Sequence, residues 1–481
     1  MPHNTLIIMS DEHSRKVMGC YGNSLAHTPH LDALAERGTV FENAYCNSPI
    51  CVPSRASLHT GLYPHQIRYW DNAMPYDGRV SSWGHALQRQ GKAVTSIGKL
   101  HFRDSDADTG FDEQILPLHV KDGIGDPSTL LRRNPPERPG TRQLAAMTGK
   151  GETPYWQYDE AVARATEQWL KEPREQGWTL FVSFVLPHFP LNAPQQFRDL
   201  FDANDLPLPK MQYQYTPENE VMTAMRALLD FNDHFQDEQV VREAVANYYA
   251  LAAALDSNVG RVLQALDASG LMDDTNIIYT SDHGDNLGAR GYWGKSTLWE
   301  ESVGVPLVMA GPDIPAARRN TTPVSLIDLY PTVTALAGID DEVIDVKSPR
   351  PGLNLAELAA DEQPQRAVFA EYHAVGARDG LFMLRQGRYK LIDSPGSLPL
   401  LYDLQADPEE TCNLAADAEH RTLLVRMQNQ LRAIAEPESV NEQAFADQHA
   451  RALALGGEAV IRGITPVAFT HPGDVSVKST H

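Results

Sequence analysis

The chain has 481 residues, of which 42% are hydrophobic, enough to bury one large core and a second, smaller one. Its formal charge of −22, from 63 acidic and 41 basic residues, argues against a surface that binds nucleic acid or acidic lipid. The 4 cysteines are too few and too irregularly spaced for a disulfide framework or a zinc site. We therefore expect a reducing compartment.

The N-terminal segment MPHNTLIIMSDEH contains one short apolar run that ends at an acid. It has neither a basic leader nor a small-residue cleavage site. No apolar stretch elsewhere in the sequence approaches the length of a membrane span. These features predict a cytoplasmic protein without a membrane segment.

Short apolar, β-branched runs alternate with segments of helical periodicity along most of the chain. The predicted strands are Thr5–Met9, Ala93–Ile97, Leu180–Leu186, Asn276–Thr280 and Pro306–Ala310. The predicted helices are Pro29–Arg37, Arg55–Thr60, Ser82–Gln90, Tyr158–Lys171 and Arg242–Leu266. This alternation favours an α/β fold with a large, doubly wound mixed sheet flanked by helices.

Polar side chains follow four of these strands at the points where the strands end. They are Asp11 and Glu12, Lys99 and His101, His188, and Asp282 and His283. In open α/β sheets the carboxyl ends of the strands line the ligand crevice. We therefore expect one pocket to hold all of these side chains.

The stretch PICVPSRASLHTG places Cys51 at the N-terminus of a predicted helix. Pro53 fits the first helical turn, Ser54 is a candidate cap and Gly61 is a plausible end. The partial positive charge of a helix N-terminus suits an anion or a thiolate. Taken alone, such a cysteine is more often buried packing material, so other residues must decide its role.

The set Asp11, Glu12, Asp282 and His283 is rich in carboxylates and contains one imidazole. Buried carboxylates are costly unless they are paired or bind a cation. Oxygen ligands suit Ca²⁺ and Mg²⁺, whereas an imidazole suits Mn²⁺. We predict one divalent ion at these strand ends, with Ca²⁺ or Mn²⁺ preferred to Mg²⁺.

Basic side chains predicted in the same pocket suit a tetrahedral anion. Lys99 and Lys295 supply positive charge, and His101 and His188 supply proton transfer near neutral pH. His188 lies within the stiff, apolar sequence LPHFP, which favours a positioned role. The pocket is therefore expected to bind and react with a small anionic group.

The composition changes towards the C-terminus. The segments Leu381–Arg385, Tyr389–Ile392 and Leu400–Leu404 resemble a small antiparallel sheet, and Asp417–Ile434 resembles a covering helix. We therefore divide the chain into a large domain (1–365), a small sheet-and-helix subdomain (366–435) and a tail (436–481). The apolar stretches of the tail are too short to form their own core, so they pack either on the same chain or on a second copy in a homo-oligomer, a dimer or a tetramer.

Together these motifs resemble the formylglycine-dependent sulfatases of the alkaline phosphatase superfamily, which include arylsulfatases and choline sulfatases. The sequence Cys51-Val52-Pro53-Ser54-Arg55 matches their C-x-P-S-R signature. The resemblance covers nearly the whole chain, through IIMSD, TPHLDALAERG, the strand-end clusters, SDHGD, Gly294-Lys295, RQGRYKLI and LYDLQADPEE. It implies an enzyme that hydrolyses a small sulfate ester and whose catalytic domain is the large one.

The resemblance also implies a chemical role for Cys51. In this family a separate formylglycine-generating enzyme oxidises the signature cysteine to an aldehyde, which hydrates to a diol. One hydroxyl attacks sulfur and forms a covalent sulfate ester, and the second hydroxyl then expels sulfate and restores the aldehyde. Nucleophilic catalysis at this position thus resets itself.

The remaining site residues are assigned by the same resemblance. Five positions would hold the metal, namely Asp11, Glu12, Asp282, His283 and the modified Cys51. Arg55 would orient the diol. The sulfate oxygens would be bound by Lys99, Lys295, His188 and Asn72. Of these, Asn72 matches an Asn of choline sulfatases and phosphonate monoester hydrolases. His188 with Lys295 would protonate or stabilise the leaving oxygen. His101 would remove the proton that triggers sulfate release.

Two residues depart from the usual family pattern, and they leave the substrate open. Glu12 stands where Asp or Gln is more common, and His283 replaces the Asn of many arylsulfatases, as in the choline sulfatase and phosphonate hydrolase branches. A phosphonate monoester or phosphodiester hydrolase is the alternative, because charge alone does not separate tetrahedral anions. A non-catalytic binding module is disfavoured because none of the clusters is missing. Trp70 and Trp293 are candidates for a cage around a quaternary ammonium group or an aryl ring.

Overall fold

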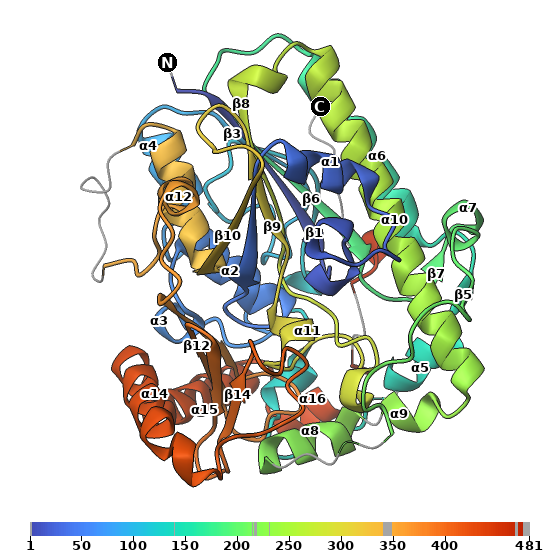
Figure 1. Cartoon of the computed structure of the whole chain (residues 1–481), viewed down its shortest axis with the longest axis vertical. Helices are drawn as coiled ribbons and strands as arrows, with labels where there is room; N and C mark the ends of the chain where they lie inside the picture. The colour runs from blue at the N-terminus through green and yellow to red at the C-terminus, as the bar shows by residue number, and fades with distance from the viewer. Residues whose placement is uncertain are drawn as a thin grey trace.

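The structure is a computed structural model that describes residues 2–138, 140–213, 215, 219–229, 231–339, 349–466 and 470–474. A large sheet lies between two layers of helices, and a smaller sheet lies at the lower left of the view in Figure 1. Among the described residues, no helix is both long and apolar enough to cross a membrane.

The large sheet contains eight strands in the order β10-β2-β9-β8-β1-β6-β3-β4. Their bounds are β1 (Asn4–Asp11), β2 (Thr39–Tyr45), β3 (Val94–Lys99), β4 (Glu113–Leu118), β6 (Thr179–Pro187), β8 (Thr275–Ser281), β9 (Leu307–Ala310) and β10 (Arg318–Ser325). Neighbouring strands are parallel except where β9 pairs with β2 and β8. The sheet is therefore mixed, as predicted, and β1 lies between β8 and β6.

Helices cover both faces of this sheet. The longer ones are α1 (Pro29–Glu36), α2 (Cys51–Thr60), α4 (Trp83–Arg89), α6 (Pro154–Lys171), α8 (Glu220–Leu229), α10 (Glu238–Ala268) and α12 (Leu329–Leu336). α5 (Gly140–Ala146) has the same length as α4, and the shorter helices are α3 (Pro64–Ile67), α7 (Gln195–Arg198), α9 (Phe231–His234), α11 (Glu300–Val303) and α13 (Leu355–Ala360). A two-stranded pair, β5 (Gly149–Lys150) with β7 (Asn192–Ala193), lies outside the large sheet.

Alternate residues of β1 point into two different apolar cores, as the period of two of a strand requires. Leu6 and Ile8 pack in the core that contains buried residues of α1, α6 and α10. Ile7 and Met9 pack in the core that contains buried residues of α2, α4 and α12. The doubly wound arrangement predicted from the sequence is confirmed.

The sequence predicts five of the eight strands, and the others show why it does not predict all of them. β4 and β10 lie at the two edges of the sheet and carry the mixed sequences EQILPL and RRNTTPVS. β2 has Glu and Asn at its centre, in TVFENAY. Without a continuous apolar run these strands give a weak signal. The predicted strand Pro306–Ala310 is present as β9, but it runs antiparallel to its neighbours.

The smaller sheet is antiparallel, with the order β11-β12-β13-β14. Its strands are β11 (Ala367–Tyr372), β12 (Leu381–Gln386), β13 (Tyr389–Asp393) and β14 (Leu400–Asp403), and α14 (Arg421–Ile434) packs on β12 and β13. The sequence predicts three of these strands and the helix, and it does not predict β11. Buried ion pairs join this sheet to the large domain, because Lys390 Nζ of β13 lies 2.8 Å from Glu300 Oε1 of α11, and Glu300 also pairs with Arg15.

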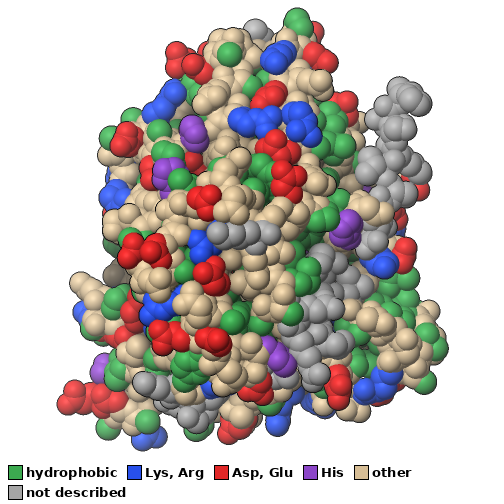
Figure 2. Space-filling view, turned by 90° about the vertical axis from the view of Figure 1, so that its right-hand side faces the viewer, with side chains coloured by type: hydrophobic (Ala, Val, Ile, Leu, Met, Phe, Trp, Pro, Cys, Tyr) green, Lys and Arg blue, Asp and Glu red, His purple; other side chains and the backbone are tan. Residues whose placement is uncertain are grey.

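The described part of the tail packs on its own chain. α15 (Pro437–Ala454) and α16 (Glu458–Arg462) contact the short turn Pro127–Leu130, and a final turn, Pro472–Asp474, packs on α6. Residues 467–469 and 475–481 of the tail lie outside the described residues. A contact with a second subunit stays a prediction. On the face drawn in Figure 2, acidic (red) and basic (blue) side chains are interspersed.

Candidate active site

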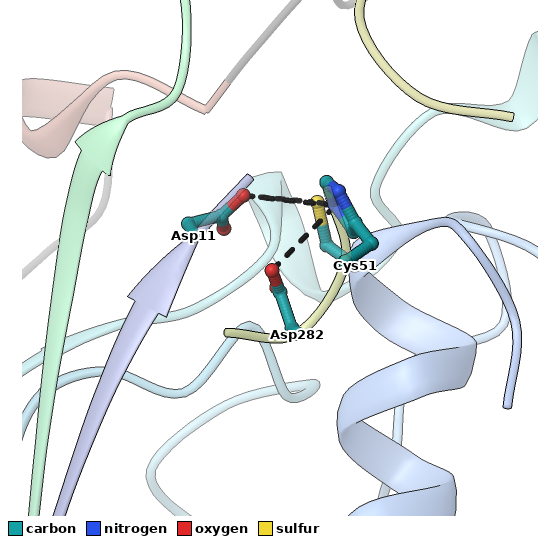
Figure 3. Close-up of side chains that lie close together, drawn as sticks. Asp11, Cys51 and Asp282 are labelled. Atoms are coloured by element: carbon teal, nitrogen blue, oxygen red, sulfur yellow. Dashed lines mark hydrogen bonds and ion pairs between the residues drawn. The ribbon is translucent and has the colours of Figure 1, made fainter. Parts of the chain in front are cut away.

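The predicted site residues converge at the carboxyl ends of adjacent strands. Asp11 is the last residue of β1 and Lys99 the last of β3, His188 follows β6, and Asp282 and His283 follow β8. These four strands lie side by side in the sheet, with β1 between β8 and β6 and with β3 next to β6. The N-terminus of α2 meets them there. Figure 3 shows Asp11, Cys51 and Asp282 pointing toward one another from β1, the start of α2 and the loop after β8.

Cys51 is the first residue of α2 and is only 1% exposed. Its Sγ lies 3.2 Å from His283 Nε2, 3.3 Å from Lys295 Nζ and 3.7 Å from Asp11 Oδ1. Burial, followed by the Asp11 carboxylate, raises the pKa of the Cys51 thiol to about 11. The expectation that the helix N-terminus favours a thiolate is therefore outweighed in this pocket, and the unmodified thiol is protonated near neutral pH.

Four side chains could jointly hold a cation. Asp11, Cys51, Asp282 and His283 each offer one donor atom, and these atoms lie within 4.8 Å of one another and are buried. The other ring nitrogen of His283, Nδ1, lies 3.0 Å from the carbonyl of Gly284, which directs Nε2 into the group. Two carboxylates and an imidazole match the donors that a divalent ion takes, so the residues present fit the predicted metal.

Arg55 orients the two carboxylates from the side opposite Cys51. Its Nε lies 2.7 Å from Asp282 Oδ2 and its Nη2 lies 3.3 Å from Asp11 Oδ2. A third set of hydrogen bonds runs from Nη1 to the carbonyl of Lys99 and to the hydroxyl of Ser183 on β6. Because these Oδ2 atoms are engaged by Arg55, one carboxylate oxygen of each Asp remains turned toward Cys51 and His283.

Lys99 pairs closely with Asp11 Oδ2 at the end of β3. Burial pushes the pKa of Asp11 up, but the neighbouring cations, Lys99 foremost, outweigh it and hold the pKa well below its usual range. Asp11 is therefore ionised despite its burial. We call Cys51, Asp11, Asp282, His283, Arg55 and Lys99 the inner group.

Glu12 is not one of the four donors grouped around Cys51, and its carboxylate is paired with Lys295 and His188. It has a left-handed backbone conformation with a φ of 68°. Its Oε2 is 3.1 Å from Lys295 Nζ and 3.4 Å from His188 Nε2, and its Oε1 is buried without a hydrogen-bond partner among the described residues. Asp11, Glu12 and His188 form a second group of potential cation donors. Burial raises the pKa of Glu12 well above its usual value.

His188 is hydrogen-bonded to Lys295, which lines the cavity beside the inner group. Nδ1 of His188 lies 2.7 Å from the carbonyl of Phe189, and Nε2 lies 2.7 Å from Lys295 Nζ. Burial, followed by the charge on Lys295, lowers the pKa of His188 well below its usual value. The imidazole is therefore neutral, with Nδ1–H donating to the carbonyl and Nε2 accepting from Lys295.

The loop that carries Lys295 is fixed by residues that the sequence analysis did not single out. Asp285 Oδ1 accepts hydrogen bonds from the backbone N–H groups of Leu287 and Gly294. Asn286 donates to the carbonyls of Gly294 and Lys295. Asp285 is the last residue of the motif SDHGD, so the motif did contain the signal. Ser183, which lies in an apolar strand sequence, gave none.

Two further predicted residues lie at the edge of this cluster. Asn72 accepts a hydrogen bond from the backbone N–H of Val52, at 3.2 Å, and so lies next to the start of α2. His101 is buried, and its Nε2 lies 3.2 Å from Oγ1 of Thr470, a residue of the tail. Ser54 does not cap α2, since its hydroxyl donates to the carbonyl of Asp282 instead.

A cavity of about 110 Å³ opens beside Lys295 and Asn72. Its apolar walls include Ile50, Phe189 and Trp293, and the ion pair of Asp126 with Arg138 also lines it. Val375 and Pro466 bring the small subdomain and the tail to its wall. We call the cavity, with Lys295, His188 and Asn72, the mouth.

The two tryptophans proposed as a cage have different positions. Trp293 lines the cavity and stacks on Phe235, with ring centroids 3.9 Å apart. Trp70 is buried away from the cavity lining and donates its indole N–H to Asp447 of α15.

The arrangement of strand ends, nucleophile position and buried cation donors defines a hydrolase of the kind that transfers a tetrahedral anionic group. The family model described as "Sulfatase" matches residues 3–339, and the model "N-sulphoglucosamine sulphohydrolase, C-terminal" matches residues 288–437. The chain therefore belongs to the sulfatase family and is a sulfuric ester hydrolase.

Two curated relatives match most of the chain. A choline-sulfatase of Rhizobium meliloti is 34% identical over 426 residues, which are 86% of this chain and 82% of the relative. Arylsulfatase K of Xenopus laevis is 27% identical over 475 residues, with 92% of this chain and 85% of the relative covered.

Two solved structures show the same fold. The phosphonate monoester hydrolase of Agrobacterium radiobacter has a TM-score of 0.73 at 24% identity, with 90% of this chain and 95% of that chain covered. The phosphonate monoester hydrolase of Silicibacter pomeroyi has a TM-score of 0.70 at 23% identity, with 90% and 94% covered. At this identity the likeness concerns the fold alone.

Proposed function

We propose that the chain hydrolyses a small organic sulfate monoester at residue 51, with Cys51 converted to formylglycine by a formylglycine-generating enzyme and with one divalent ion in the inner group. The observation that carries this proposal is the position of Cys51 Sγ, buried between cation donors and the ammonium group of Lys295. The unmodified thiol is protonated there, whereas a hydrated aldehyde offers two hydroxyl groups at the same place.

The bound ion would polarise the reacting oxygen and offset negative charge on the sulfate group. Asp11, Asp282 and His283 would hold it together with residue 51, and Glu12 has its own pairing with Lys295. We propose Ca²⁺ or Mn²⁺, because oxygen donors dominate the group and one imidazole joins them.

The residues around position 51 would have different roles, which follow from their positions. Arg55 keeps the two aspartates in position and is expected to orient the diol. Lys99 pairs with Asp11 and Lys295 lies beside Cys51, so their ammonium groups would bind sulfate oxygens, and Asn72, next to the start of α2, would also contact the sulfate. Preorganised charges of this kind are commonly the largest contribution to catalysis of such a transfer.

Proton transfer would involve two histidines, His188 and His101. His188 with Lys295 would protonate or stabilise the leaving alcohol oxygen; because His188 is neutral and its Nε2 accepts from Lys295, the proton would come from the Lys295 ammonium group. His101 would take the proton of the free hydroxyl of residue 51 as the C–O bond to sulfate breaks and the C=O bond re-forms.

The small cavity favours a small alcohol. Its volume of about 110 Å³ is below the roughly 300–1,000 Å³ typical of sites for drug-sized ligands. The two curated relatives are a choline-sulfatase and an arylsulfatase, so choline sulfate and aryl sulfates are the first substrates to test. A phosphonate monoester or phosphodiester is the alternative substrate, because the same cations serve any tetrahedral anion.

One assay decides between these substrates. Initial rates are measured on choline sulfate, nitrophenyl sulfate and short alkyl sulfates, beside a phosphonate monoester and a phosphodiester of matched alcohols. We expect the highest kcat/KM on a sulfate monoester. A phosphorus ester that exceeds every sulfate of the same alcohol would replace the proposal by its alternative.

We further propose that residues 1–365 form the catalytic domain, residues 366–435 a subdomain that supports it and residues 436–481 a tail. In support, the inner group and its cations all lie before residue 300, whereas Val375 and Pro466 reach only the cavity wall. A homo-oligomer, dimer or tetramer, and a cytoplasmic location stay predictions, to be checked by mass in solution and by cell fractionation.

A further inference from the structure

The tail of the chain enters the active site. After α15 and α16, Pro466 lines the cavity, Thr470 contacts His101, and the turn Pro472–Asp474 packs on α6. Thr470 is 6% exposed, so it is enclosed by the protein rather than lying on its surface. A residue near the C-terminus is thus in contact with the proposed base.

Thr470 is held at two points. Its Oγ1 lies 3.2 Å from Nε2 of His101, and its carbonyl oxygen accepts a hydrogen bond from the hydroxyl of Tyr155, at 2.6 Å. The ring of Tyr155 packs edge-on against His188, with centroids 5.8 Å apart. The backbone of Thr470 is therefore fixed by α6, and its side chain is directed at His101.

The two ring nitrogens of His101 differ in their surroundings. Nε2 has the Thr470 hydroxyl, whereas Nδ1 is buried without a hydrogen-bond partner among the described residues. A buried N–H without an acceptor is rarer and costlier than a buried lone pair without a donor. The proton of the neutral ring therefore belongs on Nε2, which donates it to Thr470, and Nδ1 keeps a free lone pair.

We propose that Thr470 is a positioning residue for the second half of the reaction, an inference that rests on the proposed function. By accepting the Nε2–H of His101, it fixes the tautomer and the ring so that Nδ1 is the basic nitrogen. Nδ1 then takes the proton of the free hydroxyl of residue 51. The electrons of that O–H bond form the C=O bond of the aldehyde. The bond between the side-chain carbon of residue 51 and the bridging oxygen of the sulfate ester breaks, and sulfate leaves with the electrons of that bond.

The test separates the two halves of the reaction. In Thr470→Val the hydroxyl is replaced by a methyl group of similar size, so only the hydrogen bond to His101 is lost. Release of the alcohol precedes the step in which Thr470 acts, so kcat/KM is expected to stay within about twofold of wild type. Sulfate release slows, and once it limits turnover kcat and KM fall together, by about tenfold or more.

A second readout does not depend on steady-state rates. Mass spectrometry of the peptide that contains residue 51, after quenching during turnover, is expected to show a larger sulfated fraction in Thr470→Val than in wild type. Thr470→Ser keeps the hydroxyl and is expected to restore wild-type values. His101→Ala sets the upper limit, with more sulfated enzyme than Thr470→Val.

The outcomes distinguish the inference from the function on which it rests. If His101→Ala accumulates sulfated enzyme and Thr470→Val does not, the positioning role is wrong and the proposed function stands. If neither accumulates it and wild type shows no formylglycine, both are overturned. A fall in kcat/KM with unchanged KM in Thr470→Val would indicate a structural role and overturn the inference.

The tautomer gives a third readout. Nitrogen-15 NMR of histidine-labelled wild-type protein is expected to show His101 protonated at Nε2 and bare at Nδ1, and Thr470→Val is expected to lose this preference. A wild-type ring protonated at Nδ1 would overturn the inference, whatever the kinetics.

Discussion

The inner group and the mouth meet at Cys51 but are built differently. The inner group comes from strand ends and the first turn and a half of α2, and the side chains of Asp11, Arg55 and Asp282 are 0% exposed. The mouth comes from loops, the small subdomain and the tail, and Lys295 keeps 13% of its side chain exposed. The difference teaches that strand ends and the start of α2 place the inner group, whereas loops and C-terminal segments line the cavity beside it, where the proposed function puts the alcohol.

The largest expected effect is that of Cys51→Ala, which removes the proposed nucleophile from the inner group. Turnover of every sulfate ester is expected to fall by about 10⁴-fold or more, with the thermal unfolding of the protein little changed. Cys412→Ser, at an exposed cysteine, is the matched control and should keep full activity. Mass spectrometry of the wild-type peptide should show formylglycine, and fully active enzyme with only a thiol at position 51 would contradict the proposal.

Next in size is Asp282→Asn, which keeps the shape of the side chain but removes its charge. The inner group then loses a charged metal donor, and Arg55 loses its ion-pair partner. Breaking such a buried pair lowers the free energy of unfolding by about 3–5 kcal/mol. We expect elemental analysis to find one divalent ion per chain in wild type and much less in the variant. Chelation of wild type should abolish activity, and re-addition of Ca²⁺, Mn²⁺ or Mg²⁺ separately identifies the ion. An Asp282→Asn enzyme with normal rate and metal content would rule this out.

His188→Ala tests whether a residue of the mouth assists the reaction at Cys51 of the inner group. A poor leaving alcohol needs a proton as the S–O bond breaks, whereas nitrophenolate leaves without one. We expect alkyl sulfate hydrolysis to slow by about 10²-fold more than nitrophenyl sulfate hydrolysis. His101 is the proposed base of the step that follows departure of the alcohol. His101→Ala is therefore the control, and its loss of rate should not depend on the leaving alcohol. Equal losses in His188→Ala would show that Lys295, whose Nζ lies 2.7 Å away, acts on the alcohol oxygen without His188.

The smallest effects are expected in the mouth. Arg138→Gln leaves the carboxylate of Asp126 without its partner at the cavity wall, and Asp126→Asn does the reverse. We expect Arg138→Gln to raise kcat/KM for a cationic alcohol relative to a neutral one by up to about tenfold, or 1.4 kcal/mol, and Asp126→Asn to lower it. Shifts of the same sign in both variants would show that the pair only maintains the fold.

The inner group was predictable because each of its residues is marked by the sequence directly beside it. Each residue stands directly after an apolar strand or at the start of a helix, and parallel strands bring their ends to one edge. That rule is enough to bring Asp11, Lys99 and Asp282 together, although it does not reveal that the pocket would raise the pKa of Cys51. The pKa depends on burial and on a carboxylate 40 positions away in the sequence.

Lys295, His188 and Asn72 of the mouth were predicted, but the contact of the tail with His101 was not, because it is distant in the sequence and carries no local signal. Thr470 lies 369 positions from His101, in a segment of weak periodicity. The edge strands β4 and β10 are missed for a similar reason, since their pairing rather than their apolar content defines them. Ser54 shows the limit even inside a signature motif, because tertiary contact with Asp282 replaces the expected helix cap.

The burial of Cys51 has a consequence for how the protein is made. Under the proposed function, the modifying enzyme would have to reach this side chain before the pocket closes, and the pocket closes when His283, 232 positions further along, takes its place beside Sγ. At about 5–20 residues per second, synthesis of that stretch lasts on the order of tens of seconds. If Cys51 is oxidised as proposed, the length of chain between the signature and His283 would set a time during translation in which the oxidation can occur, and molecules that fold first would keep the thiol.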